Sequence, residues 1–385
     1  MNKIIAKSRR DMGVSLVELM VALAIGTVLM LGLVQVFAAS RAAYMTAEGM
    51  SRVQENARFA IDFLQRDIRM AGHFGCVNDQ AHWVKGEGDP ARHFGSITSG
   101  EGHALDFSVS IEGYEAPNTG PANTLTLGAA WSVPTGIPTL SPVPVGGSDL
   151  IVLRFFSPEG VPVDNIAVSG GGEAVTFAAA GSGRLTSDGV GTPTLFGVAD
   201  CTHADVFPAT LAAAAVTTST STGLAARYTP QPTGQTMLYR ANSIIYYVGL
   251  NTVGEPALYR ARAGTAGTYT SEELVEGIES LQVLYGQDAR ANLTATTPPI
   301  GNITQHGTAA QIRTGGASNL PNAWRRVGLV QVGVLARSPN PSAAPGATGA
   351  IRVLGTQFNP AAVEDGRYRA SYESTIALRN RLFGN

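Results

Sequence analysis

The first pattern in the chain is an apolar run over residues 14–39, in which Glu18 is the only charged side chain. At about 1.5 Å per residue, residues 19–39 would form a helix of roughly 31 Å. That length matches the hydrocarbon core of a bilayer and exceeds the apolar region of a secretory signal peptide. The run therefore predicts a membrane-spanning helix, with signal-peptide cleavage near the small residues Ala38 and Ala39 as the alternative.

The residues before this run are basic, and residues 1–13 carry a net charge of +3. Basic flanks stay on the cytoplasmic side of a membrane. We therefore expect a cytoplasmic leader over residues 1–13 and place everything after about Arg41 outside the cytoplasm.

Beyond the run, the apolar positions keep a helical period as far as Met70, and Gly72 ends it. An unbroken helix over residues 14–70 would be about 85 Å long. Its outer half, residues 40–71, is expected to be an amphipathic stalk that lies against a globular part. The apolar stripe of this half comprises Val53, Ala57, Ala60, Ile61, Leu64 and Ile68.

From residue 72 onward, apolar and polar positions alternate and β-branched and aromatic residues are frequent, which predicts a β-rich head over residues 72–385 and an α+β fold class. A capping-box pattern over residues 270–273 predicts one helical turn that carries Leu274, Val275 and Ile278. The predicted strands span residues 104–110, 123–127, 149–156, 237–249, 257–260, 281–287, 327–337 and 368–378.

Three low-complexity stretches separate the predicted strands, at residues 209–226, 291–321 and 339–349. We expect surface loops there. The first stretch has an alternative interpretation as a linker between two sub-domains of the head.

Composition excludes several classes of protein. Charged residues make up 15% of the chain, against a usual share of about 25%, and 44% of residues are hydrophobic, so a chain disordered throughout is excluded. Arg greatly outnumbers Lys, which occurs only at positions 3, 7 and 85, yet the Arg residues are spread along the chain. Because the Arg residues are not clustered, we attribute their excess over Lys to codon usage and not to a basic binding patch. We therefore expect no nucleic-acid partner.

Glu18 is the first candidate for chemistry, because a carboxylate deep in a bilayer costs about 2.5–3.5 kcal/mol. If the chain were cut between Gly13 and Val14, the new amine of Val14 would lie one helical turn from Glu18 and supply a cation. The alternative is that Glu18 lies in the headgroup region and has no partner.

The string over residues 13–23, with Gly13 before Val14 and Glu18 five positions after Gly13, resembles the class III signal of type IV pilins and of type II secretion pseudopilins. This resemblance implies that a prepilin peptidase cleaves after Gly13 and that Val14 becomes the N-methylated terminus. It also implies that Glu18 pairs with the amine of a neighbouring subunit in a filament. The chain departs from the common pattern at Val14, where Phe is usual, and at Gln35, where major pilins often carry Pro.

Two segments of the head, residues 274–288 and the closing residues 377–381, resemble the PilW family of type IV pilus assembly proteins. The resemblance implies a minor pilin that primes or caps the pilus used for twitching motility. Its partners would be other minor pilins, the major pilin, the prepilin peptidase and a tip adhesin. The protein would reside in the inner membrane with a periplasmic head before assembly, and on the pilus at the cell surface afterwards.

Two other functions remain as alternatives. The first is a minor pseudopilin of a type II secretion system. The second is an extracytoplasmic binding protein or hydrolase anchored by a single span, which would need neither Gly13 nor Glu18.

The chain has two cysteines, Cys76 and Cys201, and both lie beyond the predicted span. An even count in an oxidising compartment predicts a disulfide between them, with two free thiols as the alternative.

No catalytic, cofactor or metal site is predicted, and we expect the protein not to be an enzyme. The chain contains no GxSxG, P-loop, EF-hand or dinucleotide-binding motif. One group of potential ligands has spacings that match no zinc motif, and it comprises His73, Cys76, Asp79, His82, Glu87, His93 and His103.

Overall fold

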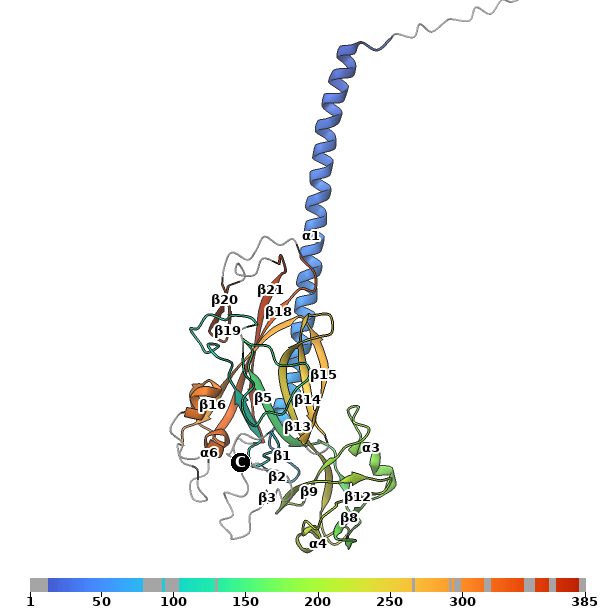
Figure 1. Cartoon of the computed structure of the whole chain (residues 1–385), viewed down its shortest axis with the longest axis vertical. Helices are drawn as coiled ribbons and strands as arrows, with labels where there is room; N and C mark the ends of the chain where they lie inside the picture. The colour runs from blue at the N-terminus through green and yellow to red at the C-terminus, as the bar shows by residue number, and fades with distance from the viewer. Residues whose placement is uncertain are drawn as a thin grey trace, which may run out of the picture.

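The computed structural model describes residues 13–78, 92–93, 104–128, 131–264, 267–290, 293, 299–314, 320–342, 350–359 and 365–380. Its dominant element is helix α1, Leu16–Met70, a single rod of 55 residues. The first half of α1 projects free of the rest of the chain, and the second half lies against a β-rich head (Figure 1). The predicted long helix and its end at Met70 are confirmed.

The head contains one large sheet with the strand order β15-β14-β13-β9-β10-β3, to which β4, β5 and β6 also pair. Every described pairing in it is antiparallel except that of β3 with β10. The strands are β3 Arg92–His93, β4 Ile111–Tyr114, β5 Leu150–Phe156, β6 Val161–Pro162, β9 Leu195–Ala199, β10 Ala204–Pro208, β13 Met237–Leu250, β14 Pro256–Ala263 and β15 Tyr269–Glu276.

A second, antiparallel sheet has the order β17-β16-β18-β21 and packs beside α1. Its strands are β16 Ile278–Asp288, β17 Ile303–Gly307, β18 Val327–Arg337 and β21 Arg369–Ala377. Two short hairpins and two short helices accompany these sheets: β1 His73–Phe74 with β2 Val77–Asn78, β19 Ile351–Val353 with β20 Thr356–Phe358, α5 Ala309–Thr314 and α6 Leu320–Arg325.

A smaller lobe, here called the distal lobe, lies at the end of the head farthest from the free half of α1 (Figure 1). It consists of the sheet β11-β12-β8-β7 with its short helices, and it has an apolar core of its own that includes Phe177, Leu185 and Val216. Residues 209–226 contribute β11, β12 and α4 to this lobe. Its elements are β7 Asn165–Ser169, β8 Gly172–Thr176, η1 Ala179–Gly181, α3 Ser182–Leu185, β11 Thr210–Leu211, β12 Ala215–Thr217 and α4 Leu224–Arg227.

The main core forms where the buried stripe of α1 meets the two large sheets. The stripe recurs every three or four residues, so one face of the helix is covered by the head. Its buried members are Gly49, Val53, Ala57, Ala60, Leu64, Asp67 and Ile68. The α+β fold with a long N-terminal helix on a β-rich head is therefore confirmed.

Six of the predicted strands are confirmed, as β5, β13, β14, β16, β18 and β21, but two are wrong. Residues 104–110 are a buried irregular segment, because the guanidinium of Arg154 binds the carbonyl oxygens of Ala104 and Val109 from the side. Residues 123–127 make only an isolated bridge at Thr124. In both segments the buried apolar residues hold a loop against the core, and the backbone does not form the repeated hydrogen bonds of a β-strand.

The helical turn predicted from the capping box at residues 270–273 is also wrong, because these residues, Leu274 and Val275 belong to strand β15 and Ile278 begins β16. Strand β15 pairs with β14, and Glu272 receives hydrogen bonds from Arg260 and Arg262 of that strand at 2.7 and 3.1 Å. Cross-strand ion pairs of this kind override the local capping pattern.

Candidate assembly site

The N-terminal segment places the two predicted processing residues directly before α1 and the predicted assembly residue, Glu18, in the first turn of that helix. Gly13 and Val14 precede the helix, and Ser15 is its N-cap. The hydroxyl of Ser15 accepts a hydrogen bond from the Val17 amide at 3.2 Å, and Glu18 accepts one from the Ser15 amide at 3.3 Å. This capping box satisfies two backbone donors that would otherwise have no partner at the helix N-terminus.

Glu18 therefore lies in the first turn, where the helix dipole favours a negative charge. Its carboxylate forms no ion pair within the described residues. The amide of Ser15 supplies one hydrogen bond, which neutralises only part of a charge that is expensive to keep in lipid. A full cation would have to come from residues outside the described part of the chain or from another molecule.

The helix after Glu18 is apolar and is not covered by the head. An 18-residue window of α1 has a mean hydropathy of 2.4 and none of it is buried. By length and composition, α1 is the one helix in the described part of the chain that could cross a membrane. Large side chains such as Leu29, Leu33 and Phe37 are each more than 60% exposed, so this half of the helix needs a lipid or protein environment.

The other end of α1 is fixed to the head by a buried polar contact. The hydroxyl of Tyr246 on β13 donates to the Asp67 carboxylate at 2.6 Å, and Arg260 on β14 donates to the same oxygen at 3.1 Å. Burial and the neighbouring Asp67 charge raise the pKa of Tyr246 well above its usual value, so its hydroxyl keeps its proton. The stalk is thus positioned by charge-assisted bonds as well as by its apolar stripe.

A larger ion-pair network holds together the strand ends where the head meets the middle of α1. It joins Glu255, in the turn between β13 and β14, to β16, β18 and the start of β21. Arg369 beside Asp365 lowers the pKa of that carboxyl to about 2. The participating residues are Glu255, Glu279, Arg337, Asp365, Arg367 and Arg369.

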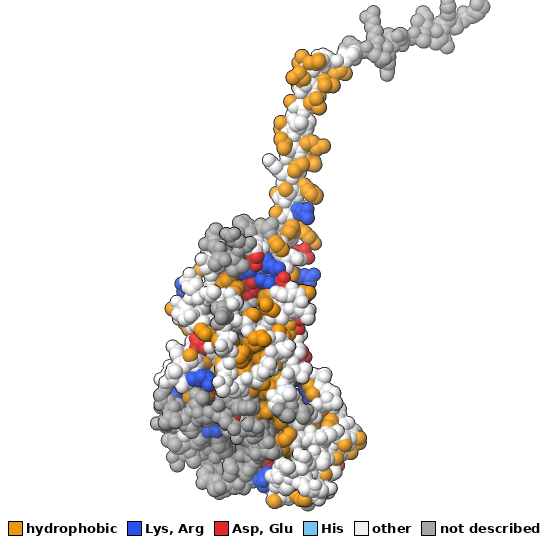
Figure 2. Space-filling view, viewed as in Figure 1, with side chains coloured by type: hydrophobic (Ala, Val, Ile, Leu, Met, Phe, Trp, Pro, Cys, Tyr) orange, Lys and Arg blue, Asp and Glu red, His pale blue; other side chains and the backbone are white. Residues whose placement is uncertain are grey.

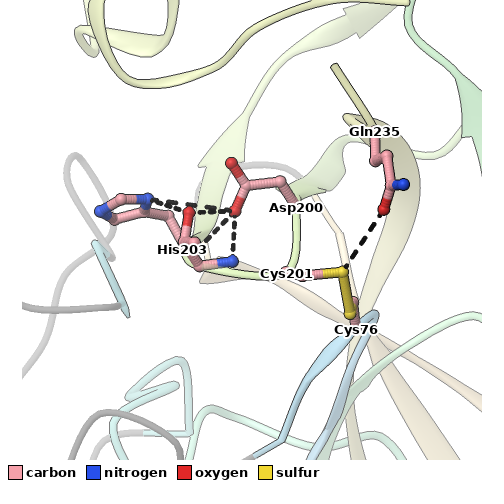
Figure 3. Close-up of a disulfide and its surroundings, with 6 residues drawn as sticks. Cys76, Asp200, Cys201, His203 and Gln235 are labelled. Carbon is pink, nitrogen blue, oxygen red and sulfur yellow. Dashed lines mark hydrogen bonds and ion pairs between the residues drawn. A yellow bond between two sulfur atoms is a disulfide. The ribbon is translucent and has the colours of Figure 1, made fainter. Parts of the chain in front are cut away.

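The predicted disulfide between Cys76 and Cys201 is confirmed, and their Cα atoms lie 4.8 Å apart (Figure 3). Cys76 follows hairpin strand β1 directly beyond the stalk, and Cys201 lies in the turn between β9 and β10. Asp200 shapes that turn, because its carboxylate accepts hydrogen bonds from the Thr202 and His203 amides, each at 2.6 Å. The disulfide ties the end of α1 to the large sheet next to the distal lobe.

Within the described residues, no group of three or more His, Cys, Asp or Glu side chains is placed to hold a metal ion. His73 packs edge-on against Tyr239, and burial lowers the pKa of its imidazole. Four other members of the group of potential ligands lie outside the described residues, namely Asp79, His82, Glu87 and His103.

We did not predict two of these features from the sequence. The capping box has a clear sequence signal, the Ser-x-x-Glu pattern of Ser15 and Glu18. The contacts of Asp67 have none, because Tyr246 and Arg260 lie 179 and 193 residues away along the chain. Only the fold brings these three side chains together.

Comparison with known protein families gives two matches. Residues 9–34 match the prokaryotic N-terminal methylation motif, and residues 245–380 match the family described as Type IV Pilus-assembly protein W. The first match covers the start of α1, and the second runs from within β13 through β21, which includes most of the sheet surface that packs on the stalk. No curated protein and no solved structure matches the chain significantly.

Proposed function

We propose that this chain, which is a pilin-like protein of the PilW family, is a minor pilin that primes or caps the assembly of a type IV pilus. A role in type IV pilus assembly follows from the family. The finer role rests on the chemistry of the α1 N-terminus and on the size of the head. The proposed partners are other minor pilins, the major pilin, the prepilin peptidase and a tip adhesin.

The observation that carries this proposal is the isolated carboxylate of Glu18. It is the only ionisable side chain between Asp11 and Arg41, and no cation pairs with it within the described residues. A subunit in lipid gains free energy when such a carboxylate meets an amine, because an unpaired charge is costly there. Docking against the free amine of another pilin therefore favours formation of the first subunit pairs.

Processing creates the amines that this pairing needs. We propose that the leader, residues 1–13, is removed after Gly13 and that Val14 becomes the methylated terminus. Gly13 and Val14 precede the helical turns, which agrees with access for a peptidase. In this arrangement residues 14–39 span the inner membrane, residues 40–71 form the stalk, and residues 72–385 lie in the periplasm.

The size of the head supports a terminal position in the filament. A shaft subunit must fit the same neighbours at every helical step, whereas a terminal subunit is free on one side. The distal lobe and the large sheet add bulk that one end of a filament accommodates easily.

Gene deletion with complementation tests this function. We expect deletion to abolish or sharply reduce surface pili while the major pilin persists in the membrane, and the wild-type gene to restore them. Complementation with Glu18→Ala should give a stable, disulfide-bonded protein that is recovered poorly with other minor pilins.

Two results would assign a different function. If deletion leaves pili and twitching intact and the secretion of an exoprotein fails, the protein is a minor pseudopilin. If pili and secretion are both unaffected, the assembly role is wrong, and an anchored binding protein or hydrolase takes its place.

A further inference from the structure

A small cavity of about 60 Å³ lies near the C-terminal end of α1, between that helix, the β13–β14 hairpin and the loop that carries Asp188. We call it the arginine cavity, because its walls include Arg66 of α1, Arg240 of β13, and Arg260 and Arg262 of β14. Only 15% of the chain is charged, and uncharged side chains predominate on the described surface in Figure 2. Four Arg side chains around one small cavity are therefore unusual in this protein.

The pairing of β13 with β14 brings polar side chains to one face of the hairpin. Ile244, which packs in the main core with α1, pairs with Arg262. Because alternate residues of a strand point to the same face, Arg240 and Asn242 lie on the same face as Ile244. The face of the hairpin that packs on α1 therefore becomes polar at this point, and its polar side chains line the cavity.

Charge in the arginine cavity is not balanced. Among the described residues, three carboxylates bind the four guanidiniums, which leaves a net charge of +1. An adjoining outer cavity of about 420 Å³ adds Asp62 and Arg69, whose charges cancel. A largely buried excess cation attracts an anion more strongly than an exposed one, because water screens it less. The ion pairs, with distances from 2.7 to 3.3 Å, are Arg66–Asp188, Arg240–Asp188, Arg260–Asp67, Arg260–Glu272 and Arg262–Glu272.

Arg262 has donors that no described residue accepts. Its Nε donates to Glu272 at 3.1 Å, and its two terminal nitrogens make no hydrogen bond within the described residues, although only 18% of the side chain is exposed. Arg240, with a side chain 3% exposed, lines the same cavity. Burial and the neighbouring charge of Arg262 lower the pKa of Arg240, so the two guanidiniums repel each other. An anion between them would accept the free donors and relieve this repulsion.

We propose that the arginine cavity binds a phosphate group between the guanidiniums of Arg240 and Arg262. The cavity has room for roughly four water molecules or for one small anion in their place. A carboxylate has two oxygens, which a single guanidinium fork can satisfy, whereas the oxygens of a tetrahedral phosphate can bind two forks at once. The outer cavity gives access, so the group is either the free ion or part of a larger small molecule. This site does not depend on the role proposed in pilus assembly.

Asp188 limits the affinity of the cavity for an anion. Its carboxylate binds Arg240 at 3.3 Å and Arg66 at 3.2 Å, so a phosphate beside Arg240 also lies close to this negative charge. Asp188 has a φ of 57°, a backbone conformation that Asn also adopts readily. Asp188→Asn therefore removes the competing charge while it preserves the shape of the loop, and it should strengthen phosphate binding.

Isothermal titration calorimetry of the purified full-length chain in detergent tests the proposal. The ligand is inorganic phosphate, and sodium chloride keeps the ionic strength constant, so general salt effects cancel. We expect phosphate to bind at a single site and acetate to bind about tenfold more weakly, because acetate loses one charge-assisted contact. Glucose 6-phosphate distinguishes the sources. If it binds as phosphate does, a phosphorylated small molecule is supported; if only phosphate binds, the free ion is supported.

Three variants test the residues involved. Arg262→Gln should weaken phosphate binding about tenfold, because it removes one charge-assisted contact and leaves Glu272 bound to Arg260. Asp188→Asn should strengthen binding, a direction that a general loss of structure cannot produce. Arg58→Gln, at an exposed position of α1 outside the cavity, removes the same charge as Arg262→Gln and should leave binding unchanged.

Formation of the disulfide reports that each variant is folded. No phosphate binding above the chloride background would overturn the proposal, as would an affinity that Arg262→Gln does not change or that Asp188→Asn lowers. Acetate that binds as tightly as phosphate would overturn the assignment to a tetrahedral anion.

Discussion

Ser15 and Glu18 share the first turn of α1, and their reciprocal hydrogen bonds fix where the helix begins. This places the proposed cleavage point two residues before the helix starts. A peptidase could therefore reach the peptide bond after Gly13 without first breaking the hydrogen bonds of the helix. The short distance from Val14 to Glu18 also explains why a new terminal amine matters, since a carboxylate in lipid is stabilised by a nearby cation.

The mature chain is predicted to begin at Val14. Cleavage after Gly13 removes a leader of net charge +3 and changes the formal charge from −2 to −5. Intact-mass measurement of protein extracted from membranes should give the mass of residues 14–385 plus one methyl group. An uncut chain, or a chain that begins near residue 39, would contradict the pilin interpretation of the N-terminus.

Asp67 is predicted to be the polar residue on which stalk docking depends most. Asp67→Ala leaves the hydroxyl of Tyr246 with only the Phe63 carbonyl, at 3.3 Å, as an acceptor, and it removes one of the two carboxylates that bind Arg260. We expect a loss of about 2–4 kcal/mol in the free energy of unfolding, because a buried charge loses a partner. Tyr246→Phe removes the contacts of the hydroxyl with Asp67 and with the Phe63 carbonyl but leaves Asp67 bound to Arg260, so it should cost only about 1 kcal/mol.

Urea unfolding of the full chain in detergent measures both effects. Equal stabilities for wild type and Asp67→Ala would show that the apolar stripe alone holds α1 against the head.

At the scale of elements, the ends of the strands next to α1 are held together by ion pairs between side chains as well as by the backbone hydrogen bonds of the sheet. Glu279 on β16 binds Arg337 on β18 and Arg369 on β21, so three neighbouring strands share one buried carboxylate. The two Arg side chains present planar forks that match carboxylates. Our interpretation of the Arg excess as codon usage therefore missed a structural role that appears only when the strands are paired.

This network predicts a loss of stability in acid. The pKa of Asp365 is about 2 in the folded protein and 3.8 when unperturbed, chiefly because Arg369 binds the ionised form. A depressed pKa contributes stability above pH 4, and that contribution is lost as the pH falls from about 4 to 2. Asp365→Asn should cost about 2 kcal/mol at pH 7 and should make the unfolding free energy less dependent on pH in that window.

Unfolding curves of wild type and Asp365→Asn, collected between pH 2 and 7, make this comparison. Parallel pH profiles for the two proteins would show that Asp365 does not contribute through its charge.

The disulfide is predicted to stabilise the head through its long loop. It joins residues 125 positions apart, and closing such a loop restricts the unfolded chain by about 4–5 kcal/mol in the chain-entropy model. Mass mapping without reductant should recover one peptide pair containing Cys76 and Cys201. The double variant Cys76→Ser with Cys201→Ser should unfold at lower denaturant, and complete alkylation of both cysteines without reductant would refute the bond.

The elements with a long, regular hydrophobic period were predictable from sequence. The helix ending at Met70 and the strands β13, β16 and β18 have patterns that extend over many residues. Residues 104–110 were not predictable, because their shape depends on Arg154 from a distant strand. The same holds for β15, whose Glu272 is fixed by cross-strand partners.

At the scale of the whole molecule, the chain combines one helix suited to a membrane with a large head of two sheets and a distal lobe (Figure 1). The N-terminal signal and the cysteine pair could be recognised in the sequence because each depends on residue type and spacing alone. The arginine cavity could not, since its walls come from α1, from the β13–β14 hairpin and from the loop of Asp188, which lie far apart along the chain. The distal lobe, too, is defined only by packing.

The central claim, that this protein initiates or caps the pilus, is tested most directly by locating it on isolated filaments. An epitope tag inserted at the exposed β-turn of Gly170 and Gly171 in the distal lobe, detected by immunogold electron microscopy, reports that position. Because a filament extended from the membrane carries its first subunits outward, we predict label at one end of each pilus and none along the shaft. Regular label along the shaft, or pili that never carry label while the tagged protein restores piliation, would contradict the account.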